Sequence, residues 1–554
     1  MEHKYKRFRI PNRDVKLTES EVAITHTRTF QRLFYLKQLG LAHLVYASAT
    51  HTRAAHSIEC LDEASKLLES LKVAEDDQSW EEVRMAALLH DIAHVPFSHT
   101  LEDENQVLPK HDKGERLQSV LNKLTEEVDG GTRELIGRAA PILMAISGEN
   151  DEERDWRSDL VGNTICADLL AYITTDAAWT GIEKRPGYYR VYDYFKRVYK
   201  PIEDGKGKER LCILLTKGGL RTDIVSAILD LLDMRYALTE RVIFHHAKAM
   251  ASAMLGRAAR LVDLSDGPHL WTIGDEAFLD YLNERSSGFQ DKQTGEGAKM
   301  LLDHLRSRRL YKRIFKVQRH AMEEWDRGRS SADRDRFCSR LRQSAEVERL
   351  LNTVENRFDI PRGGLVLWCP EGKSGMKLVK VNVVWDQANG LHTPVELRSE
   401  EVLRQFPGVH ERVETIEKQY LDLWTFWVGI HPDYIRLAPS VVDAISSELE
   451  IECDPVFIET YAKTRLPGFA DAFQTQKTID NTWRTQFMPA VSQRLMDAAA
   501  RDGSAVDSAV VAEAIRTVSE ERQTATKQKA TRKQADQPEL IQVVNERKVR
   551  EPKE

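Results

Sequence analysis

The strongest chemical signal in the sequence is a run in which ionisable side chains interrupt an apolar helical pattern. The segment ALLHDIAHVPFSH, residues 87–99, places His90, Asp91 and His94 directly before a proline. Burying such side chains on an apolar helix is costly unless a metal ion or a charged partner compensates. The adjacent His-Asp pair therefore indicates a metal site near the end of a helix.

Two other segments can add side chains to this site. Arg53 and His56 stand three residues apart before a helical run, which puts a cation and an imidazole on the same side. Asp168, Tyr172 and Asp176 repeat at a spacing of four, so one helix face presents two carboxylates and a phenol.

These segments offer two imidazoles and two carboxylates as metal ligands, namely His56, His90, Asp91 and Asp168. A mixed nitrogen and oxygen set suits Mn, Fe, Mg, Zn or Ni, with open positions for water and substrate. We therefore expect a divalent metal cofactor, whose identity the ligands do not decide. Taken alone, His56 is more often a hydrogen-bonded or surface histidine and Asp168 a helix cap, but the His-Asp pair favours metal binding for the set.

The elements that must position these residues are mostly helices. Helical periodicity runs from residue 30 to about 350, which predicts a mainly α fold with a helical core at residues 1–350. Alternation in LVLWC and KLVKVNVVW after Ile360 predicts two strands. Helical patterns resume in EVLRQF, RVETIEKQYLDLWTFWVGI and SVVDAISSELEI, so residues 351–519 form a smaller mixed α/β lobe. Residues 520–554 lack large apolar residues and should be a flexible charged tail.

Composition excludes several classes of protein. The 554 residues carry 80 basic and 87 acidic side chains, a net charge of -7, so nucleic acid is not an expected partner. Six scattered cysteines without a CxxC pair argue against a disulfide framework and a zinc ribbon. The sequence contains neither a signal-peptide pattern nor a run of about 18 apolar residues, so we expect a soluble cytoplasmic protein without membrane contact.

The chain resembles the HD phosphohydrolase superfamily, whose signature is an upstream His, the His-Asp pair and a downstream Asp. More narrowly, QRLFYLKQLGLAHLVYASATHTRAAHS followed by LLHDIAHVPFSHTLE resembles the deoxynucleoside triphosphate (dNTP) triphosphohydrolase branch, which includes bacterial dGTPases and the vertebrate enzyme with a sterile alpha motif. The resemblance covers about residues 21–316. Within it, the elements F-Q-R-L, Q-L-G, H-x-R-x-x-H, H-D-x-x-H-x-P-F-S-H, D-x-x-x-Y-x-x-x-D and R-Y-x-L occur in the family's order.

This resemblance implies roles at the matching positions. The metal ligands are the four residues named above. The implied catalytic residues are His99, Glu102, His94 and His111, with the Glu102 carboxylate expected to orient and charge the His99 imidazole. The implied substrate-binding residues are Arg53 and Arg235 for the phosphates, Gln38, Tyr172 and Asp176 for the deoxyribose, and His245 near the nucleotide.

Two positions depart from the family's pattern. Vertebrate-type members have a Lys directly after the metal-binding Asp, whereas this chain has Leu169, so its triphosphate binding should be weaker or arranged differently. The family's regulatory nucleotide pocket uses an Asp and an Arg where this chain has His26 and Phe34. Regulation by guanine nucleotide at that pocket is therefore not expected.

The resemblance implies a metal-dependent hydrolase that cleaves a dNTP to deoxynucleoside and triphosphate by attack of water at the α-phosphate. Two alternatives stay open. One is an HD-type phosphodiesterase, nuclease or nucleotidase that acts on another phosphoester, and the other is a nucleotide-responsive regulatory subunit. A homo-oligomer is also implied, and a nucleotide activator and a role in phage defence are open.

Overall fold

The computed structural model describes most of the chain, namely residues 5–10, 13–111, 115–148, 151–183, 187–201, 207–318, 337, 339–370, 380–387, 390–487, 489–491, 493–494 and 516–518. Two compact units divide the chain, Met1–Leu466 and Pro467–Glu554. The first unit contains every site residue that the sequence predicts. Residue 350, where the sequence predicts a change of lobe, falls inside this unit, and strands from both sides of it pair with one another.

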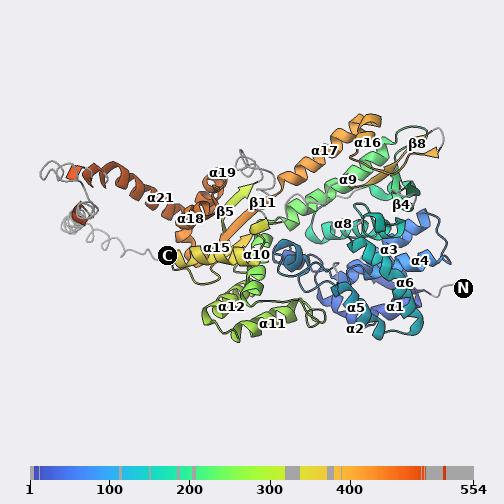
Figure 1. Ribbon diagram of the computed structural model, residues 1–554, viewed down its shortest axis with the longest axis horizontal. Coiled ribbons are helices and arrows are strands. Elements are labelled where there is room, and N and C mark those ends of the chain that lie inside the picture. Colours follow the sequence, from blue (N-terminus) through green and yellow to red (C-terminus); the bar gives the residue numbers. More distant parts are fainter. Residues whose placement is uncertain are drawn as a thin grey trace, which may run out of the picture. The chain divides into compact units, whose positions relative to one another are not determined.

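The fold class is confirmed, because the first unit is built mainly from helices (Figure 1). The helices of its first half are α1 (Glu19–Thr25), α2 (Arg28–Gln31), α3 (Arg53–Ser70), α4 (Gln78–Leu89), α5 (Glu115–Glu126), α6 (Gly130–Ser147), α7 (Trp156–Val161) and α8 (Ala167–Thr180). Those of its second half are α9 (Thr222–Leu238), α10 (His246–Leu261), α11 (Asp275–Ser287), α12 (Lys292–Arg306), α15 (Ser344–Arg357), α16 (Glu400–Gln405), α17 (Pro407–Asp422), α18 (Ala438–Leu449), α19 (Pro455–Phe457) and α20 (Lys463–Arg465).

Helix α3 packs against both α4 and α8, and the three helices form the scaffold of the site. One hydrophobic core runs through all three, with Ile58, Leu88 and Leu170 among its fully or almost fully buried residues. The Thr52 side chain caps α3 by accepting a hydrogen bond from the Ala55 N–H. At the other end of the scaffold, α8 stops at Gly181, whose positive φ of 72° a residue with a Cβ rarely adopts.

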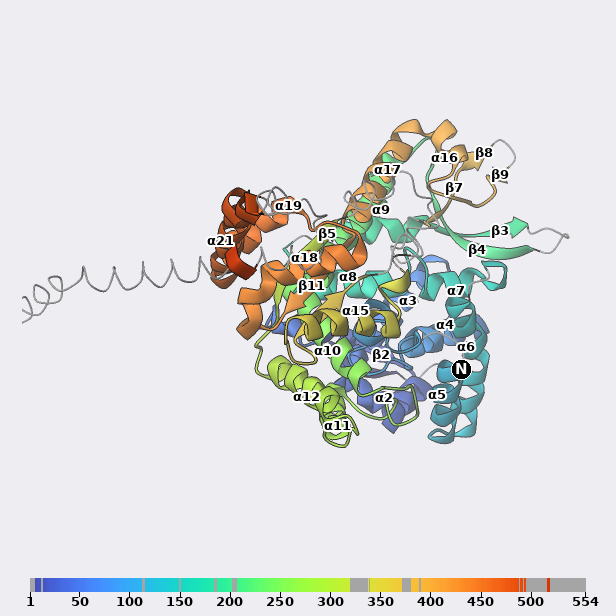
Figure 2. The same ribbon diagram turned by 60° about the vertical axis from the view of Figure 1, so that its left-hand side comes forward.

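Two sheets join distant parts of the first unit. The four-stranded sheet has the order β10-β7-β4-β3, and the antiparallel three-stranded sheet has the order β5-β11-β6. Helix α17 packs along α9 beside the first of these sheets (Figure 2). The strands are β1 (Lys6–Ile10), β2 (Arg13–Leu17), β3 (Phe195–Pro201), β4 (Gly207–Leu214), β5 (Lys312–Gln318), β6 (Leu365–Trp368), β7 (Asn382–Val384), β8 (Asp386–Gln387), β9 (Gly390–Leu391), β10 (Val395–Glu396) and β11 (Thr425–Ile430).

The structure corrects one predicted helix. The pattern RVETIEKQYLDLWTFWVGI predicts a single helix, but α17 ends at Asp422 and residues 425–430 form strand β11. All six residues of β11 are buried between β5 and β6, and a short apolar run of this kind has no periodicity that separates a buried strand from a buried helix. The predicted strands in LVLWC and KLVKVNVVW correspond to β6 and to β7, although residues 377–379 lie outside the described residues.

The second unit contains helix α21 (Pro467–Thr482) and a small apolar cluster of Phe487, Val491 and Val518. The tail predicted at residues 520–554 lies outside the described residues. Among the helices that the structure describes, none combines the length and the hydropathy needed to cross a membrane.

Candidate active site

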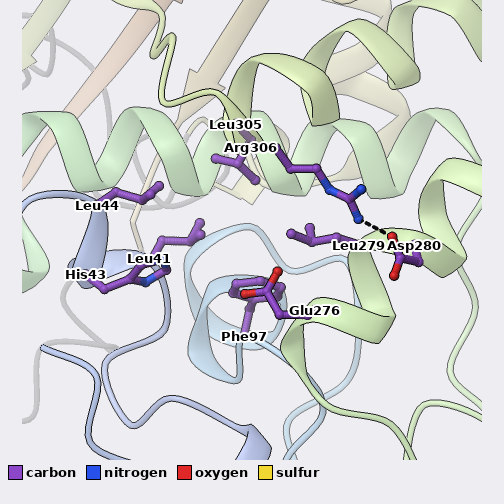
Figure 3. A pocket seen from close by; sticks show the side chains of 9 residues that line it. All are labelled: Leu41, His43, Leu44, Phe97, Glu276, Leu279, Asp280, Leu305 and Arg306. Carbon is purple, nitrogen blue, oxygen red and sulfur yellow. Dashed lines mark hydrogen bonds and ion pairs between the residues drawn. The ribbon is translucent and has the colours of Figure 1, made fainter. Parts of the chain in front are cut away.

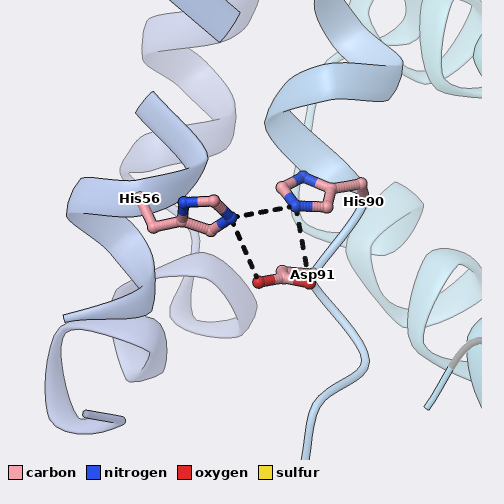
Figure 4. Close-up of side chains that lie close together, drawn as sticks. All are labelled: His56, His90 and Asp91. Atoms are coloured by element: carbon pink, nitrogen blue, oxygen red, sulfur yellow. Dashed lines mark hydrogen bonds and ion pairs between the residues drawn. The ribbon is translucent and has the colours of Figure 1, made fainter. Parts of the chain in front are cut away.

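Three helix ends bring the expected metal ligands together. His56 lies in the first turn of α3, His90 and Asp91 follow the last turn of α4, and Asp168 lies in the first turn of α8. Figure 4 shows the imidazoles of His56 and His90 facing each other from two helices, with the Asp91 carboxylate between them. The side chains of His56 and Asp91 are almost fully buried, and that of Asp168 is partly exposed.

The distances among these groups fit a shared cation. His56 Nε2 lies 3.3 Å from His90 Nε2 and 3.1 Å from Asp168 Oδ1. His90 Nε2 lies 3.5 Å from Asp91 Oδ1 and 3.7 Å from Asp168 Oδ1. Atoms that each lie about 2.1 Å from one ion are about 3.0 to 3.5 Å apart in octahedral or tetrahedral geometry. His56, His90 and Asp91 are thus a group that could hold a metal ion.

A hydrogen bond from Nδ1 of the His90 imidazole determines that its Nε2 atom faces the site. His90 Nδ1 lies 2.8 Å from the Ala87 carbonyl oxygen and can contact it only as a donor. Its Nε2 atom then faces His56 Nε2 and the carboxylates of Asp91 and Asp168, and these carboxylates raise the pKa of His90 despite its burial. Two buried imidazole nitrogens and two carboxylates that converge in this way need a positive charge between them, so the residues fit a divalent cation.

The surrounding charges keep both carboxylates ionised. Burial alone raises the pKa of Asp91, but the Arg53 guanidinium and the imidazoles of His90 and His94 hold this pKa well below its ordinary value. Arg53 Nη1 donates directly to Asp91 Oδ2, and the arginine side chain is only 1% exposed. The pKa of Asp168 is also lowered, because hydrogen bonds from His56 and His90 outweigh its burial. Ionised carboxylates are the form that binds a cation.

A second histidine cluster adjoins the first through Asp91. The rings of His94 and His111 stack with centroids 3.4 Å apart, and His94 Nε2 lies 3.2 Å from Asp91 Oδ1. Glu102 Oε2 lies 3.3 Å from His94 Nδ1 and 3.0 Å from His111 Nδ1. Burial and the Arg53 guanidinium lower the pKa of His94 to about 3, so this imidazole is neutral near pH 7.

The expected pairing of His99 with Glu102 is wrong. His99 Nδ1 lies 2.5 Å from Asp103 Oδ2 instead, and the His99 side chain is half exposed. His99 precedes the π-helical turn Thr100–Glu104, which brings the residue four positions later to its side. Glu102 turns inward, where Arg116 Nη1 donates to its Oε1 at 2.5 Å. His99 still lies at this cluster, because its ring centroid is 4.8 Å from that of His94.

Two of the residues expected to read the sugar lie on the same helix as the expected metal ligand Asp168. Tyr172 and Asp176 follow Asp168 along α8, and Asp176 is buried. Gln38 Oε1 is also buried and has no hydrogen-bond partner among the described residues. A buried amide oxygen without a partner is costly, so it indicates a group that a ligand can satisfy.

Two predicted substrate-binding residues remain, Arg235 and His245, and of these only Arg235 lies on a helix that packs against α8. Arg235 lies in the last turn of this helix, α9, and its charge opposes the effect of burial, which raises the pKa of Tyr172. His245 instead caps α10, with its ring 5.9 Å from that of Tyr46 and 4.5 Å from that of His246. None of its contacts with described residues reaches the metal ligands.

Comparison with known proteins identifies the domain that carries this geometry. Residues 53–131 match the family model of the HD domain. The chain carries an HD domain. The matched range contains His56, His90 and Asp91 and ends before Asp168.

Relatives extend the similarity beyond the HD domain. The chain is 28% identical over 291 residues to an uncharacterized protein of Methanocaldococcus jannaschii, which covers 50% of this chain and 55% of the relative. It is also 24% identical over 309 residues to the deoxynucleoside triphosphate triphosphohydrolase SAMHD1 homolog of Dictyostelium discoideum. That alignment covers 52% of this chain and 56% of the relative. The chain thus spans about half the length of these curated relatives. A hypothetical protein from Aquifex aeolicus shares the fold, with a TM-score of 0.52, 19% identity, and coverage of 79% of this chain and 100% of that one.

The sequence did not single out two residues that organise the HD domain and its surroundings. His51 Nε2 lies 2.8 Å from Asp176 Oδ1, its ring stacks on Trp179, and its carbonyl oxygen accepts a hydrogen bond from the Gln38 N–H. Its only signal in the sequence is the first position of H-x-R-x-x-H. Arg116, whose guanidinium donates to Glu102, follows His111 by five residues and belongs to no recognisable sequence pattern.

Proposed function

We propose that this protein is a metal-dependent dNTP triphosphohydrolase. The observation that carries the proposal is the convergence of His56, His90, Asp91 and Asp168 beside the buried guanidinium of Arg53. The relatives named as deoxynucleoside triphosphate triphosphohydrolases support the choice of substrate.

The reaction forms one bond and breaks one bond at the α-phosphorus. The oxygen of a water molecule bonds to phosphorus, the bond to the 5′ oxygen breaks, and deoxynucleoside and triphosphate leave. The four ligands would hold a divalent ion, which would supply the positive charge that acidifies water and stabilises negative phosphoryl oxygens. Arg53 and Arg235 add fixed cations for the phosphates, which matters because Leu169 offers none.

The histidine cluster next to Asp91 carries the group that we assign to proton transfer. Glu102 Oε2 accepts a hydrogen bond from His111 Nδ1 and lies 3.3 Å from His94 Nδ1, and the Nε2 atoms of both rings are directed toward Asp91. The half-exposed His99, held by Asp103, is the group that we assign to protonate the departing 5′ oxygen. Its exposure suits a group that must meet a substrate, whereas the buried His94 serves to position its neighbours.

Sugar recognition follows from the polar groups beyond the metal ligands. The buried Gln38 Oε1 can accept a hydrogen bond from the 3′ hydroxyl, and Asp176 offers a second acceptor. The ring of Tyr172 packs beside the sugar and leaves little space for a 2′ hydroxyl. A ribonucleotide would bury that hydroxyl without a partner, which costs about 1 to 3 kcal/mol.

The test is product identification with metal-loaded protein. Each dNTP and each ribonucleoside triphosphate (rNTP) is incubated alone and in mixtures, and the products are separated by ion-exchange chromatography. We expect deoxynucleoside and triphosphate in equal amounts, and no product with the Asp91→Ala variant. Release of pyrophosphate, or equal cleavage of an rNTP and its matching dNTP, would contradict the proposal and favour an HD enzyme for another phosphoester.

A further inference from the structure

The turn that leads into His99 has an unfavourable backbone conformation. Phe97 has a φ of 57° and Ser98 a φ of 46°, so two successive residues with a Cβ occupy the left-handed region. Such conformations persist only where the surrounding structure holds them. The turn also presents a site group directly, because Ser98 Oγ accepts a hydrogen bond from Arg53 Nε at 2.6 Å.

A carboxylate from a distant helix holds this turn. Asp275, the first residue of α11, is 1% exposed. Its Oδ1 accepts a hydrogen bond from the Phe97 N–H at 2.8 Å, and its Oδ2 accepts one from the Lys37 N–H at 2.9 Å. One buried side chain therefore ties the turn before His99 to the residue that precedes Gln38.

Packing also restrains this turn. Gly40, at a φ of 51°, lies against it, because a Cβ there would contact the Phe97 carbonyl oxygen at 3.4 Å. On the other side, the Phe97 ring borders a hollow of about 400 Å³ that is also lined by Leu41, Glu276 and Leu279 (Figure 3). The Phe97 side chain is nevertheless only 2% exposed and its ring lies 6.2 Å from that of Phe278, so core packing and the hydrogen bond to Asp275 hold the turn together.

We propose that Asp275 is a positioning residue of the active site. It holds the Phe97–Ser98 turn in the conformation that places His99 and, through Ser98, the Arg53 guanidinium. It acts through the backbone, and it lies outside both the proposed metal ligands and the groups assigned to the substrate. The kinetic part of this inference rests on the proposed function, whereas the conformational part does not.

The central variant is Asp275→Asn, with Glu276→Gln as its matched control. An asparagine has one carbonyl oxygen in place of two carboxylate oxygens, so one of the two backbone N–H groups loses its acceptor. Glu276 lies in the same helical turn and loses the same charge, but among the described residues it bonds the Lys37 side chain alone, at 3.2 Å. Asp275→Glu is the milder variant, since it keeps the charge and moves the carboxylate by one methylene.

Two measurements decide the proposal. In Asp275→Asn we expect kcat for a dNTP to fall on the order of 10²-fold, the usual effect of displacing a catalytic group by about 1 Å, with the bound metal retained. Hydrogen–deuterium exchange should accelerate in peptides that span residues 95–101 and stay unchanged in α3 and α8. Glu276→Gln should match the wild type in both measurements.

A double-variant comparison distinguishes loss of the backbone restraint at the turn from general destabilisation of the fold. Glycine adopts a positive φ without steric penalty, so Asp275→Asn should lower kcat by a smaller factor in a Ser98→Gly background. An equal factor in both backgrounds would overturn the proposal. So would wild-type kcat and exchange in Asp275→Asn, or accelerated exchange throughout α3, α4 and α8 with loss of metal. Should Asp275→Asn not fold, Asp275→Glu decides by the same criteria. If the wild type cleaves no dNTP, the proposed function fails, and the exchange measurement alone decides whether Asp275 holds the turn.

Discussion

Replacing Asp91 with alanine should separate its two electrostatic roles. Its Oδ1 faces the imidazoles of His90 and His94, whereas its Oδ2 accepts from Arg53, whose side chain is 1% exposed. We assign the Oδ1 atom to metal binding, and the contact of Oδ2 offsets the buried positive charge of Arg53. Asp168 is the natural comparison, because its side chain is 29% exposed and its described contacts are with His56 and His90.

The difference in cost follows from burial. Removing one member of a buried ion pair leaves the other charge uncompensated and costs about 3 to 5 kcal/mol. Asp168 is more exposed than Asp91, so water can partly replace its lost contacts. We therefore expect metal-free Asp91→Ala to lose several kcal/mol of unfolding free energy and metal-free Asp168→Ala to lose less. Both variants should lose the bound metal.

The assay combines metal analysis with urea unfolding of chelator-treated protein. Asp91→Asn serves as a further variant, because its carbonyl oxygen still accepts from Arg53 and should reduce the loss of stability. Equal unfolding free energies for Asp91→Ala and Asp168→Ala would refute the assigned ion pair. Stoichiometric metal in Asp91→Ala would refute the proposed ligand set.

Four further predictions concern catalysis, selectivity, control and pH. His99→Ala should keep the metal and lower kcat by about 10² to 10⁴, the span of general acid catalysis; loss of metal by elemental analysis would move His99 into the ligand set. Tyr172→Ala should narrow the preference for a dNTP over the matching rNTP in steady-state kinetics, and an unchanged ratio would exclude Tyr172 from sugar selection. Activity should not require GTP, which rate measurements on purified substrates with and without GTP can contradict. Burial and the neighbouring His304 lower the pKa of His431 to about 4, so between pH 6.5 and about 4 the unfolded chain binds a proton that the folded state does not. The unfolding free energy should fall as the pH drops through this range, and His431→Gln should flatten that dependence in urea titrations.

Sequence patterns recovered the parts of the fold that local periodicity encodes. The helices around residues 57–71, 223–238 and 246–262 appear as α3, α9 and α10, because a repeating apolar face is a property of the segment itself. Strands β4 and β11 were missed as strands. Strand β11 is stabilised by pairing with β5 and β6, which lie far away in the chain, and no local pattern records those partners. Strand β4 pairs mainly with its chain neighbour β3 and, at its end, with the distant β7.

The candidate site divides in the same way. By itself, the sequence determined which side chains could bind a cation, since the His-Asp pair on an apolar helix, His56 and Asp168 are chemically conspicuous wherever they stand. Only the tertiary structure decided that Asp103 rather than Glu102 contacts His99, that Arg116 holds Glu102, and that Asp275 reaches the Phe97 backbone. Residue type fixes what a group can donate or accept. Which group it meets depends on how helices distant in sequence pack, and a buried polar atom takes the partner that this packing brings within hydrogen-bonding distance.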